Sequence, residues 1–232
     1  MRLCVIPARG GSKRIPRKNI RSFRGLPMIV WSIKAAQSAG CFDEIVVSTD
    51  DNEIADLAAS YGVKVPFLRP LRLADDYANT QDVMSHAIKS CLPSQTDVDN
   101  ICCLYATAPF VQATDLNQAL SLLESSRLGT FVFSATSFGF PIQRAIHIDS
   151  EGYSRAYDSV NINKRSQDLE ELFHDAGMFY WASAATWCQS PNIFDAGRPL
   201  LLPHWRVQDI DTEDDWNRAE LMHFAIERLM HS

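Results

Sequence analysis

A basic, glycine-containing loop follows a short apolar run near the start of the chain. Gly10 and Gly11 allow the backbone to approach an anion closely and to point several N–H groups at it. Arg9, Lys13 and Lys18 place positive charge on side chains of the same loop. Neither the P-loop pattern nor the dinucleotide-binding fingerprint occurs there. The loop therefore predicts another kind of triphosphate site, and the alternative is a solvated basic loop.

Asp209 and Asp211 form a second candidate site, because side chains two positions apart on an extended segment point to the same side. Mg²⁺ prefers one or two carboxylates together with waters and phosphate oxygens. The pair therefore predicts a magnesium site opposite a bound triphosphate. The alternative is an acidic segment that leads into the last helix, whose N-terminus favours Asp214 and Asp215 in any case. The residues alone support both interpretations equally.

The elements that must position these residues are short apolar runs that alternate with amphipathic helical patterns. We expect strands over 3–6, 45–48, 63–67, 101–104, 131–133 and 178–181. We expect helices over 27–39, 52–61 and 80–91, a helix capped by Thr114 and a last helix that opens at 212–215. This pattern indicates an α/β fold with an open, doubly wound, mostly parallel sheet. Ligands of such sheets bind at the carboxyl ends of the strands, where the basic loop would lie.

The strand and helix pattern weakens between about residues 138 and 176, where aromatic and polar residues mix without a clear period. We interpret 1–232 as a single domain that carries this segment as an inserted arm. A long segment without its own core is typically functional or an oligomer contact. The arm is therefore expected to cover the site or to reach a second subunit.

The charge balance argues against a general affinity for nucleic acid or anionic membranes, because 22 Lys and Arg face 28 Asp and Glu, a net charge of −6. No apolar run is long enough to span a bilayer, and the first residues show no cleavable signal pattern. Six scattered cysteines without metal-ligand spacing predict reduced thiols. We therefore expect a cytoplasmic protein that binds neither nucleic acid nor membrane.

Three motifs follow one another along the chain: IPARGGSKRIPRKN at 6–19, VSTDD at 47–51 and QDIDTEDD at 208–215. Through them the chain resembles the cytidylyltransferases that make CMP-sialic acids. The stretches FGFPIQR at 138–144 and RSQDLEELFHDAGMFYW at 165–181 are most similar to the branch that activates pseudaminic acid. The resemblance implies transfer of CMP from CTP to the anomeric hydroxyl of a nine-carbon acidic sugar, with Mg²⁺ as cofactor and a homodimer as the assembly.

The resemblance also implies roles for individual residues. The implied nucleotide contacts are Pro7, Ala8, Arg9, Gly10, Ser12, Lys13, Lys18, Asn19, Arg69 and Thr80. Arg9 and Lys18 would stabilise charge on the triphosphate as catalytic residues. The general base is not evident from the resemblance, and our own hypothesis is that Asp211 accepts the proton, with the metal on Asp209 and Asp211. With the family in view, the metal interpretation of the aspartate pair is favoured.

The sugar carboxylate calls for planar, bidentate donors. The candidate sugar contacts are Tyr105, Gln143, Arg144, Arg165, Gln167 and Tyr180. The alternative for Arg165 is an ion pair with an acidic neighbour such as Asp168. Tyr105 stands where sialic acid enzymes typically carry glutamine, an exchange that favours apolar contact with a deoxygenated sugar ending in a methyl group. Pseudaminic acid fits this description.

Two alternatives stay open at this point. One is a cytidylyltransferase for N-acetylneuraminic or legionaminic acid. The other is a non-catalytic sensor of nucleotide sugars that keeps the fold but not the chemistry. The intact Arg9, Lys18, Asp209 and Asp211 argue against the sensor.

Overall fold

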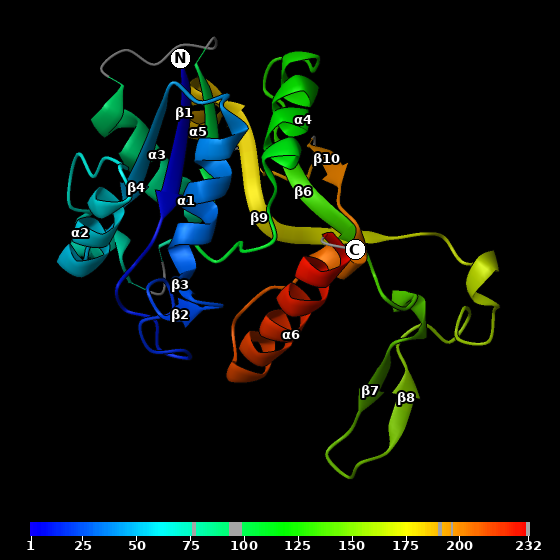
Figure 1. Ribbon diagram of the computed structural model, residues 1–232. Coiled ribbons are helices and arrows are strands. Elements are labelled where there is room, and N and C mark those ends of the chain that lie inside the picture. The colour runs from blue at the N-terminus through cyan, green and yellow to red at the C-terminus, as the bar shows by residue number, and fades with distance from the viewer. Residues whose placement is uncertain (76–77, 93–98, 190–191, 196, 231–232) are drawn as a thin grey trace.

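A six-stranded sheet with the strand order β10-β6-β9-β5-β1-β4 forms the centre of the protein (Figure 1). The computed structural model describes residues 1–75, 78–92, 99–189, 192–195 and 197–230. The strands of this sheet are β1 (Arg2–Pro7), β4 (Glu44–Ser48), β5 (Asn100–Leu104), β6 (Val132–Ser137), β9 (Phe173–Ser183) and β10 (Arg198–Leu201). β9 runs antiparallel to both of its neighbours, and the other strand pairs are parallel. The sheet is therefore mostly parallel, as predicted.

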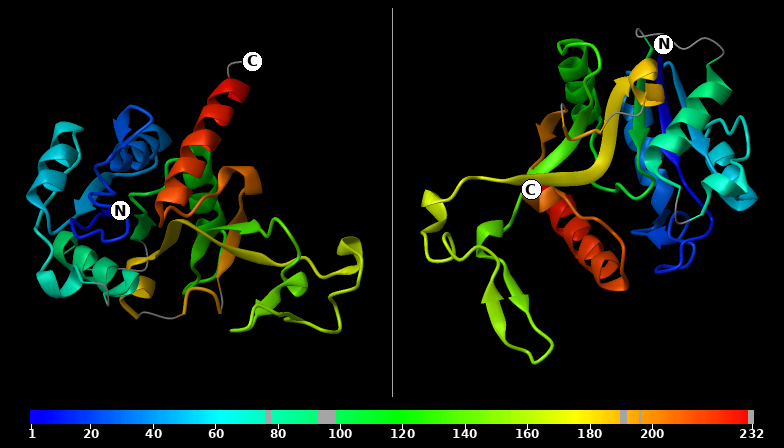
Figure 2. Two further views of the ribbon diagram at one scale, coloured as in Figure 1. Left: turned by 90° about the horizontal axis from the view of Figure 1, so that it is seen from below. Right: turned by 180° about the vertical axis from the view of Figure 1, so that it is seen from behind.

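Helices cover both faces of this sheet (Figures 1 and 2). They are α1 (Met28–Ala39), α2 (Asn52–Ser60), α3 (Thr80–Cys91), α4 (Ala113–Glu124), α5 (Ala184–Gln189) and α6 (Glu213–Met230). β1 needs cover on both sides, because its Cys4 and Ile6 pack in one hydrophobic cluster and its Leu3 and Val5 in the other. α1, α4 and α6 contribute to the first cluster, and α3 and α5 to the second. No helix in the described ranges is long and apolar enough to cross a membrane.

One expected strand is wrong. Residues 63–67 form no named strand, and Lys64 and Leu68 make only isolated bridges beside β4. Pro66 lies between these bridges and has no N–H to donate to a ladder, which accounts for the interruption. The chain therefore runs alongside the edge of the sheet without extending it.

One helix begins elsewhere than predicted. The N-cap of α4 is Gln112 and not Thr114. The Asp115 side chain reaches back and accepts the backbone N–H of Gln112 at 2.9 Å, which fixes the start of the helix two residues earlier. This turn directly follows the loop at the end of β5, so it helps to shape that end of the sheet.

Most of the arm, residues 138–172, projects away from the sheet and its helices, and the last residues of the predicted range, 173–176, already belong to β9 (Figures 1 and 2). It contains the short hairpin of β7 (Ile146–Ile148) and β8 (Ser154–Ala156) and two 3-10 turns, Ile142–Arg144 and Ser166–Asp168. All of its residues are described, and none from 138 to 175 is buried. Phe140 and Val160 are 85% and 76% exposed. The arm thus has no core of its own, as predicted.

Candidate active site

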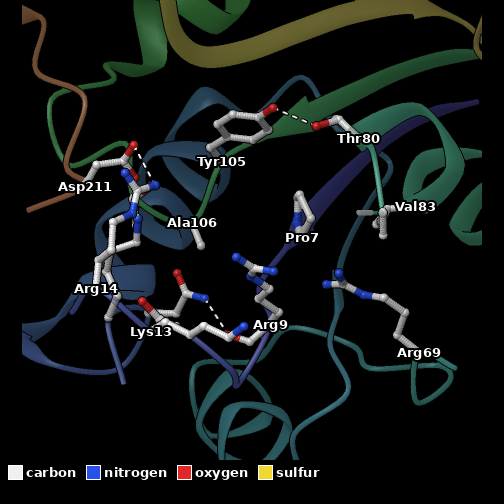
Figure 3. Close-up of a pocket in the computed structure, with 15 residues that line it drawn as sticks. Pro7, Arg9, Lys13, Arg14, Arg69, Thr80, Val83, Tyr105, Ala106 and Asp211 are labelled. Atoms are coloured by element: carbon white, nitrogen blue, oxygen red, sulfur yellow. Dashed lines mark hydrogen bonds and ion pairs between the residues drawn. The ribbon is translucent and has the colours of Figure 1, made fainter. Parts of the chain in front are cut away.

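A cavity of about 530 Å³ opens at the carboxyl ends of β1 and β5 (Figure 3). Pro7 is the last residue of β1, and Tyr105 directly follows β5. The cavity is lined by Pro7, Arg9, Ser12, Lys13, Arg14, Lys18, Asn19, Arg69, Ala78, Thr80, Val83, Tyr105, Ala106, Thr107 and Asp211. The location agrees with the general rule for ligands of open α/β sheets. Five cationic side chains make this lining suited to a polyanion.

Backbone and side-chain contacts hold the basic loop in place beneath the cavity. The Arg9 guanidinium donates to the carbonyl of Asp75 at 2.9 Å. The Asn19 amide donates to the carbonyl of Arg9 at 2.9 Å, and the Gly10 N–H donates to Asp50 at 3.1 Å. Ala8 is 1% exposed and packs in the hydrophobic core. Ala8 and Gly10 therefore shape the loop and do not line the cavity.

Asp51 fastens the same loop to the N-terminus of α2. Its carboxylate caps α2 by accepting the N–H groups of Glu53 and Ile54 at 2.9 and 3.1 Å. It also accepts the guanidinium of Arg17, whose backbone holds the left-handed conformation at φ 57°. The hydrogen bond from Arg17 lowers the pKa of Asp51. A Cβ on Gly10 would overlap this carboxylate, so glycine is required at that position.

Asp211 faces the cationic loop across the cavity (Figure 3). Its carboxylate lies 2.9 Å from the Arg14 guanidinium and 3.3 Å from the Lys18 ammonium. The Lys18 ammonium also donates to the carbonyl of Ile210 at 2.7 Å. Lys18 therefore links the loop to the segment that carries the aspartate pair.

Asp209 lies beside Asp211 but outside the cavity lining. Partial desolvation and then the nearby Asp211 carboxylate raise the pKa of Asp209. Ile210, between them, is fully buried, so the two aspartates flank an anchored residue. Within the described ranges, no group of three or more His, Cys, Asp or Glu side chains is placed to hold a metal ion. A metal at this pair would therefore need further ligands from the substrate or from water.

Arg69 and Thr80 line the side of the cavity opposite Asp211 (Figure 3). Arg69 is only 6% exposed and donates to the carbonyls of Ser48 and Leu73, while its buried Nε has no partner. Burial lowers the pKa of Arg69. Thr80 is the first residue of α3, and its hydroxyl lies 2.8 Å from the Tyr105 hydroxyl.

Tyr180 stands behind Tyr105 and does not line the cavity. The centroids of the two rings lie 5.5 Å apart, and Tyr180 is 4% exposed. Its hydroxyl donates to the carboxylate of Asp175, near the root of the arm. Of the predicted sugar contacts, only Tyr105 lines this cavity, and Tyr180 supports it from behind.

The remaining predicted sugar contacts lie on the arm, outside the cavity of their own chain. Gln143 donates to the carbonyl of Glu170 at 2.9 Å, and Arg144 donates to the carbonyl of Lys164. Arg165 pairs with Asp168 through two hydrogen bonds of 2.7 and 3.1 Å, which is the alternative that the sequence left open. Gln167 and Gln143 line a second cavity, of about 360 Å³, within the arm.

Some cavity residues were not among the predicted site residues. Arg14, Ala78, Val83, Ala106 and Thr107 all line the cavity. Arg14 belongs to the same basic run as Lys13, which was the available signal. The small residues Ala78, Ala106 and Thr107 carry no chemical signal in a single sequence.

The comparisons with known proteins agree on one kind of enzyme. Residues 3–187 match the family model described as cytidylyltransferase. The chain is 44% identical over 223 residues to the pseudaminic acid cytidylyltransferase of Campylobacter jejuni subsp. jejuni, with 95% of each chain covered. It is 36% identical over 231 residues to the CMP-N,N'-diacetyllegionaminic acid synthase of Legionella pneumophila, with 94% of each covered.

A solved structure shares the fold at low sequence identity. It is the CMP:2-keto-3-deoxy-manno-octonic acid synthetase complexed with CTP, with a TM-score of 0.70 and 14% identity over 97% of this chain and 98% of that one. At this identity the likeness concerns the fold alone. It confirms the predicted α/β fold of the nucleotidyltransferase type.

Proposed function

The chain belongs to the cytidylyltransferase family, and we propose that it transfers CMP from CTP to pseudaminic acid. The anomeric oxygen of the sugar forms a bond to the α-phosphorus of CTP, and the bond to the pyrophosphate leaving group breaks. The observation that carries this assignment is the 44% identity to a pseudaminic acid enzyme over 95% of both chains. The legionaminic acid relative is less similar, at 36% identity.

The residues of the cavity suit this reaction, because phosphoryl transfer depends chiefly on positioning and on neutralising charge. Arg9, Lys13 and Lys18 surround the space where a triphosphate would lie. Arg9 and Lys18 are assigned to stabilise charge that develops on the phosphates. Asp211, on the far side, is assigned to accept the proton of the attacking hydroxyl. Arg69 and Thr80 are assigned to the cytidine.

Mg²⁺ is the cofactor of this proposal, and Asp209 and Asp211 would hold it. The fit rests on the charges, since two carboxylates close enough for Asp211 to raise the pKa of Asp209 gain from a shared cation. The Arg14 side chain is 66% exposed, so its ion pair with Asp211 is replaced at little cost. When bound, Mg²⁺ supplies neutralisation of phosphate charge and lowers the pKa of the attacking hydroxyl.

A homodimer is also part of the proposal. The arm has no buried residue between 138 and 175 and exposes large apolar side chains, which favours an intermolecular partner. Arg144 and Arg165 lie outside the cavity of their own chain, and a second copy would allow each arm to present them to its partner's cavity.

The cytoplasmic location stays a prediction, which is consistent with the free thiols of Cys4 and Cys102.

One assay tests the activity and its alternatives. Pyrophosphate release is measured with CTP, ATP, GTP or UTP, with Mg²⁺, and with pseudaminic, N,N'-diacetyllegionaminic or N-acetylneuraminic acid. We expect release with CTP and pseudaminic acid, at a kcat/KM at least about tenfold above the other sugars. A preference for another acid would reassign the acceptor. CTP binding without release from any sugar would favour the non-catalytic sensor.

A further inference from the structure

Arg206 and Asp115 form a buried, two-pronged ion pair beside the candidate active site. Their side chains are 7% and 6% exposed. The guanidinium donates to the two carboxylate oxygens at 2.6 and 2.9 Å and to the carbonyl of Phe110 at 3.1 Å. Neither side chain lines the cavity, so the pair contacts no substrate there.

The pair joins two segments that form different parts of the cavity lining. Asp115 lies in the first turn of α4 and holds the N-cap of that helix, directly after the loop that places Ala106 and Thr107 in the lining. Arg206 ends the 3-10 turn His204–Arg206, from which the chain runs to Asp211. One guanidinium thus ties the loop after β5 to the segment that carries the aspartates.

Asp211 is held between this pair and a second anchor. Only four residues separate Arg206 from Asp211, and Ile210 among them is fully buried. On the other side, the Asp215 carboxylate accepts the N–H groups of Asp211 and Thr212 at 3.2 and 2.8 Å. The N-terminal end of the segment 207–211 is therefore held in place by Arg206.

Stability alone does not account for a buried ion pair. Removing two charges from water costs free energy that their attraction often only balances, and apolar replacements of similar volume are frequently as stable. A buried ion pair can instead fix the geometry of the segments that it joins, which apolar packing would leave less well defined.

We propose that Arg206 and Asp115 are a positioning pair that sets Asp209 and Asp211 against the cationic loop, an inference that rests on the proposed transfer of CMP. The pair acts through the backbone of 207–211. Its loss therefore displaces the carboxylates while the sheet and the triphosphate loop remain intact. A misplacement of about 1 Å is enough to cost on the order of 100-fold in turnover.

The test uses the full chain with the double substitution Asp115→Leu and Arg206→Met, which removes both charges and keeps the site filled. We expect a melting temperature within a few degrees of wild type and a CTP affinity within about threefold. We expect kcat with CTP, Mg²⁺ and pseudaminic acid to fall at least about tenfold with little change in the KM of CTP. Normal kcat in the folded double variant overturns the proposal.

Hydrogen exchange provides a readout that does not depend on the sugar. Amides of residues 207–212 are expected to exchange faster in the double variant, while those of β1 stay unchanged. An unchanged rate over 207–212 overturns the proposal even if the wild type uses another sugar or none. Should no sugar support turnover in the wild type, it is the proposed function that fails.

Two further variants keep the test decisive. Arg206→Lys retains the charge but loses the fork, so it is expected to fold and still to lower kcat, and full activity in it also overturns the proposal. Lys64→Met with Glu44→Leu removes an exposed ion pair of 2.7 Å outside the cavity. This control is expected to leave kcat and the exchange of 207–212 unchanged.

Discussion

The hydroxyl groups of Tyr105 and Thr80 lie 2.8 Å apart, and both residues line the cavity. Burial raises the pKa of Tyr105 to about 12, so the phenol is neutral at physiological pH. Its hydroxyl is engaged with Thr80, and its ring packs near that of Tyr180. We therefore expect Tyr105 to offer a bound sugar mainly an aromatic surface, which suits a deoxygenated substituent.

Replacing Tyr105 by Gln is expected to weaken the preference for pseudaminic acid. The glutamine amide would form hydrogen bonds with the hydroxyl groups of N-acetylneuraminic acid. The substitution would also remove the apolar contact of the tyrosine ring with pseudaminic acid. We expect the ratio of kcat/KM for pseudaminic over N-acetylneuraminic acid to fall about tenfold. Tyr105→Phe is the matched control, because it keeps the ring, and its ratio should stay within about twofold of wild type. An unchanged ratio in the Tyr105→Gln variant would show that Tyr105 does not determine which sugar is preferred.

Asp211→Asn is expected to lower kcat by about 100-fold or more at saturating Mg²⁺. The amide keeps the size of the side chain and loses both the charge and the proposed proton acceptor. The ion pairs of Asp211 with Arg14 and Lys18 are partly exposed, so the melting temperature should change little. Steady-state turnover and thermal unfolding are measured together. Near-normal turnover with Mg²⁺ saturating contradicts the assignment of Asp211.

The link between Asp51 and Arg17 predicts a pH dependence of stability. The folded-state pKa of Asp51 is lowered, so its carboxylate stabilises the fold above its ordinary pKa near 4 and loses this contribution as the pH falls through the folded-state value. Asp51→Asn keeps an N-cap for α2 and loses the ion pair. We expect it to destabilise by under about 1 kcal/mol at pH 7, with the difference shrinking below about pH 4.

Asp51→Ala removes the N-cap as well and is expected to cost about 1 kcal/mol more than Asp51→Asn. Urea unfolding at pH 7 and at pH 3.5 measures both differences. A gap between wild type and Asp51→Asn that grows toward low pH would contradict the role given to the carboxylate.

Local patterns predicted most of the fold and the basic loop that lines the cavity. The run Leu3–Ile6 is apolar without alternation because both faces of β1 are covered, and this identifies a strand inside a two-sided α/β sheet. Gly10 and the cations near it predict anion binding from the sequence, because the requirement is local: backbone N–H groups and positive charge on one loop.

Contacts between segments that are distant along the chain could not be predicted from the sequence. The antiparallel direction of β9 depends on how the arm returns to the sheet, and its residues read like those of any buried strand. Arg206 and Asp115 are 91 positions apart, so nothing in the sequence pairs them. Thr114 is as good an N-cap type as any, and Gln112 took that place because Asp115 reaches back to its N–H.

The arginines of the arm could contact a sugar in the cavity of their own chain or in that of a partner chain. Arg165 is engaged with Asp168 and lies outside the cavity of its own chain. The Arg165 side chain is 73% exposed, so the pair with Asp168 is weak and open to exchange for a sugar carboxylate. In a symmetric dimer whose arms cross, each site would combine the loop of one chain with the arm of the other.

Mixing two inactive variants tests that arrangement. Arg9→Ala disables the cavity of its own chain, and Arg165→Ala disables the arm, so each variant alone is expected to lose most of its turnover. After subunit exchange, half of the dimers are mixed, and each mixed dimer has one intact site, which restores about a quarter of wild-type turnover per site. A mixture of the single variants Arg9→Ala and Lys18→Met is the control. Both substitutions lie in the cavity, so no mixed dimer has an intact site. Recovery only in the first mixture supports exchange of arms, and the absence of recovery despite mixed dimers places Arg165 outside the partner's site.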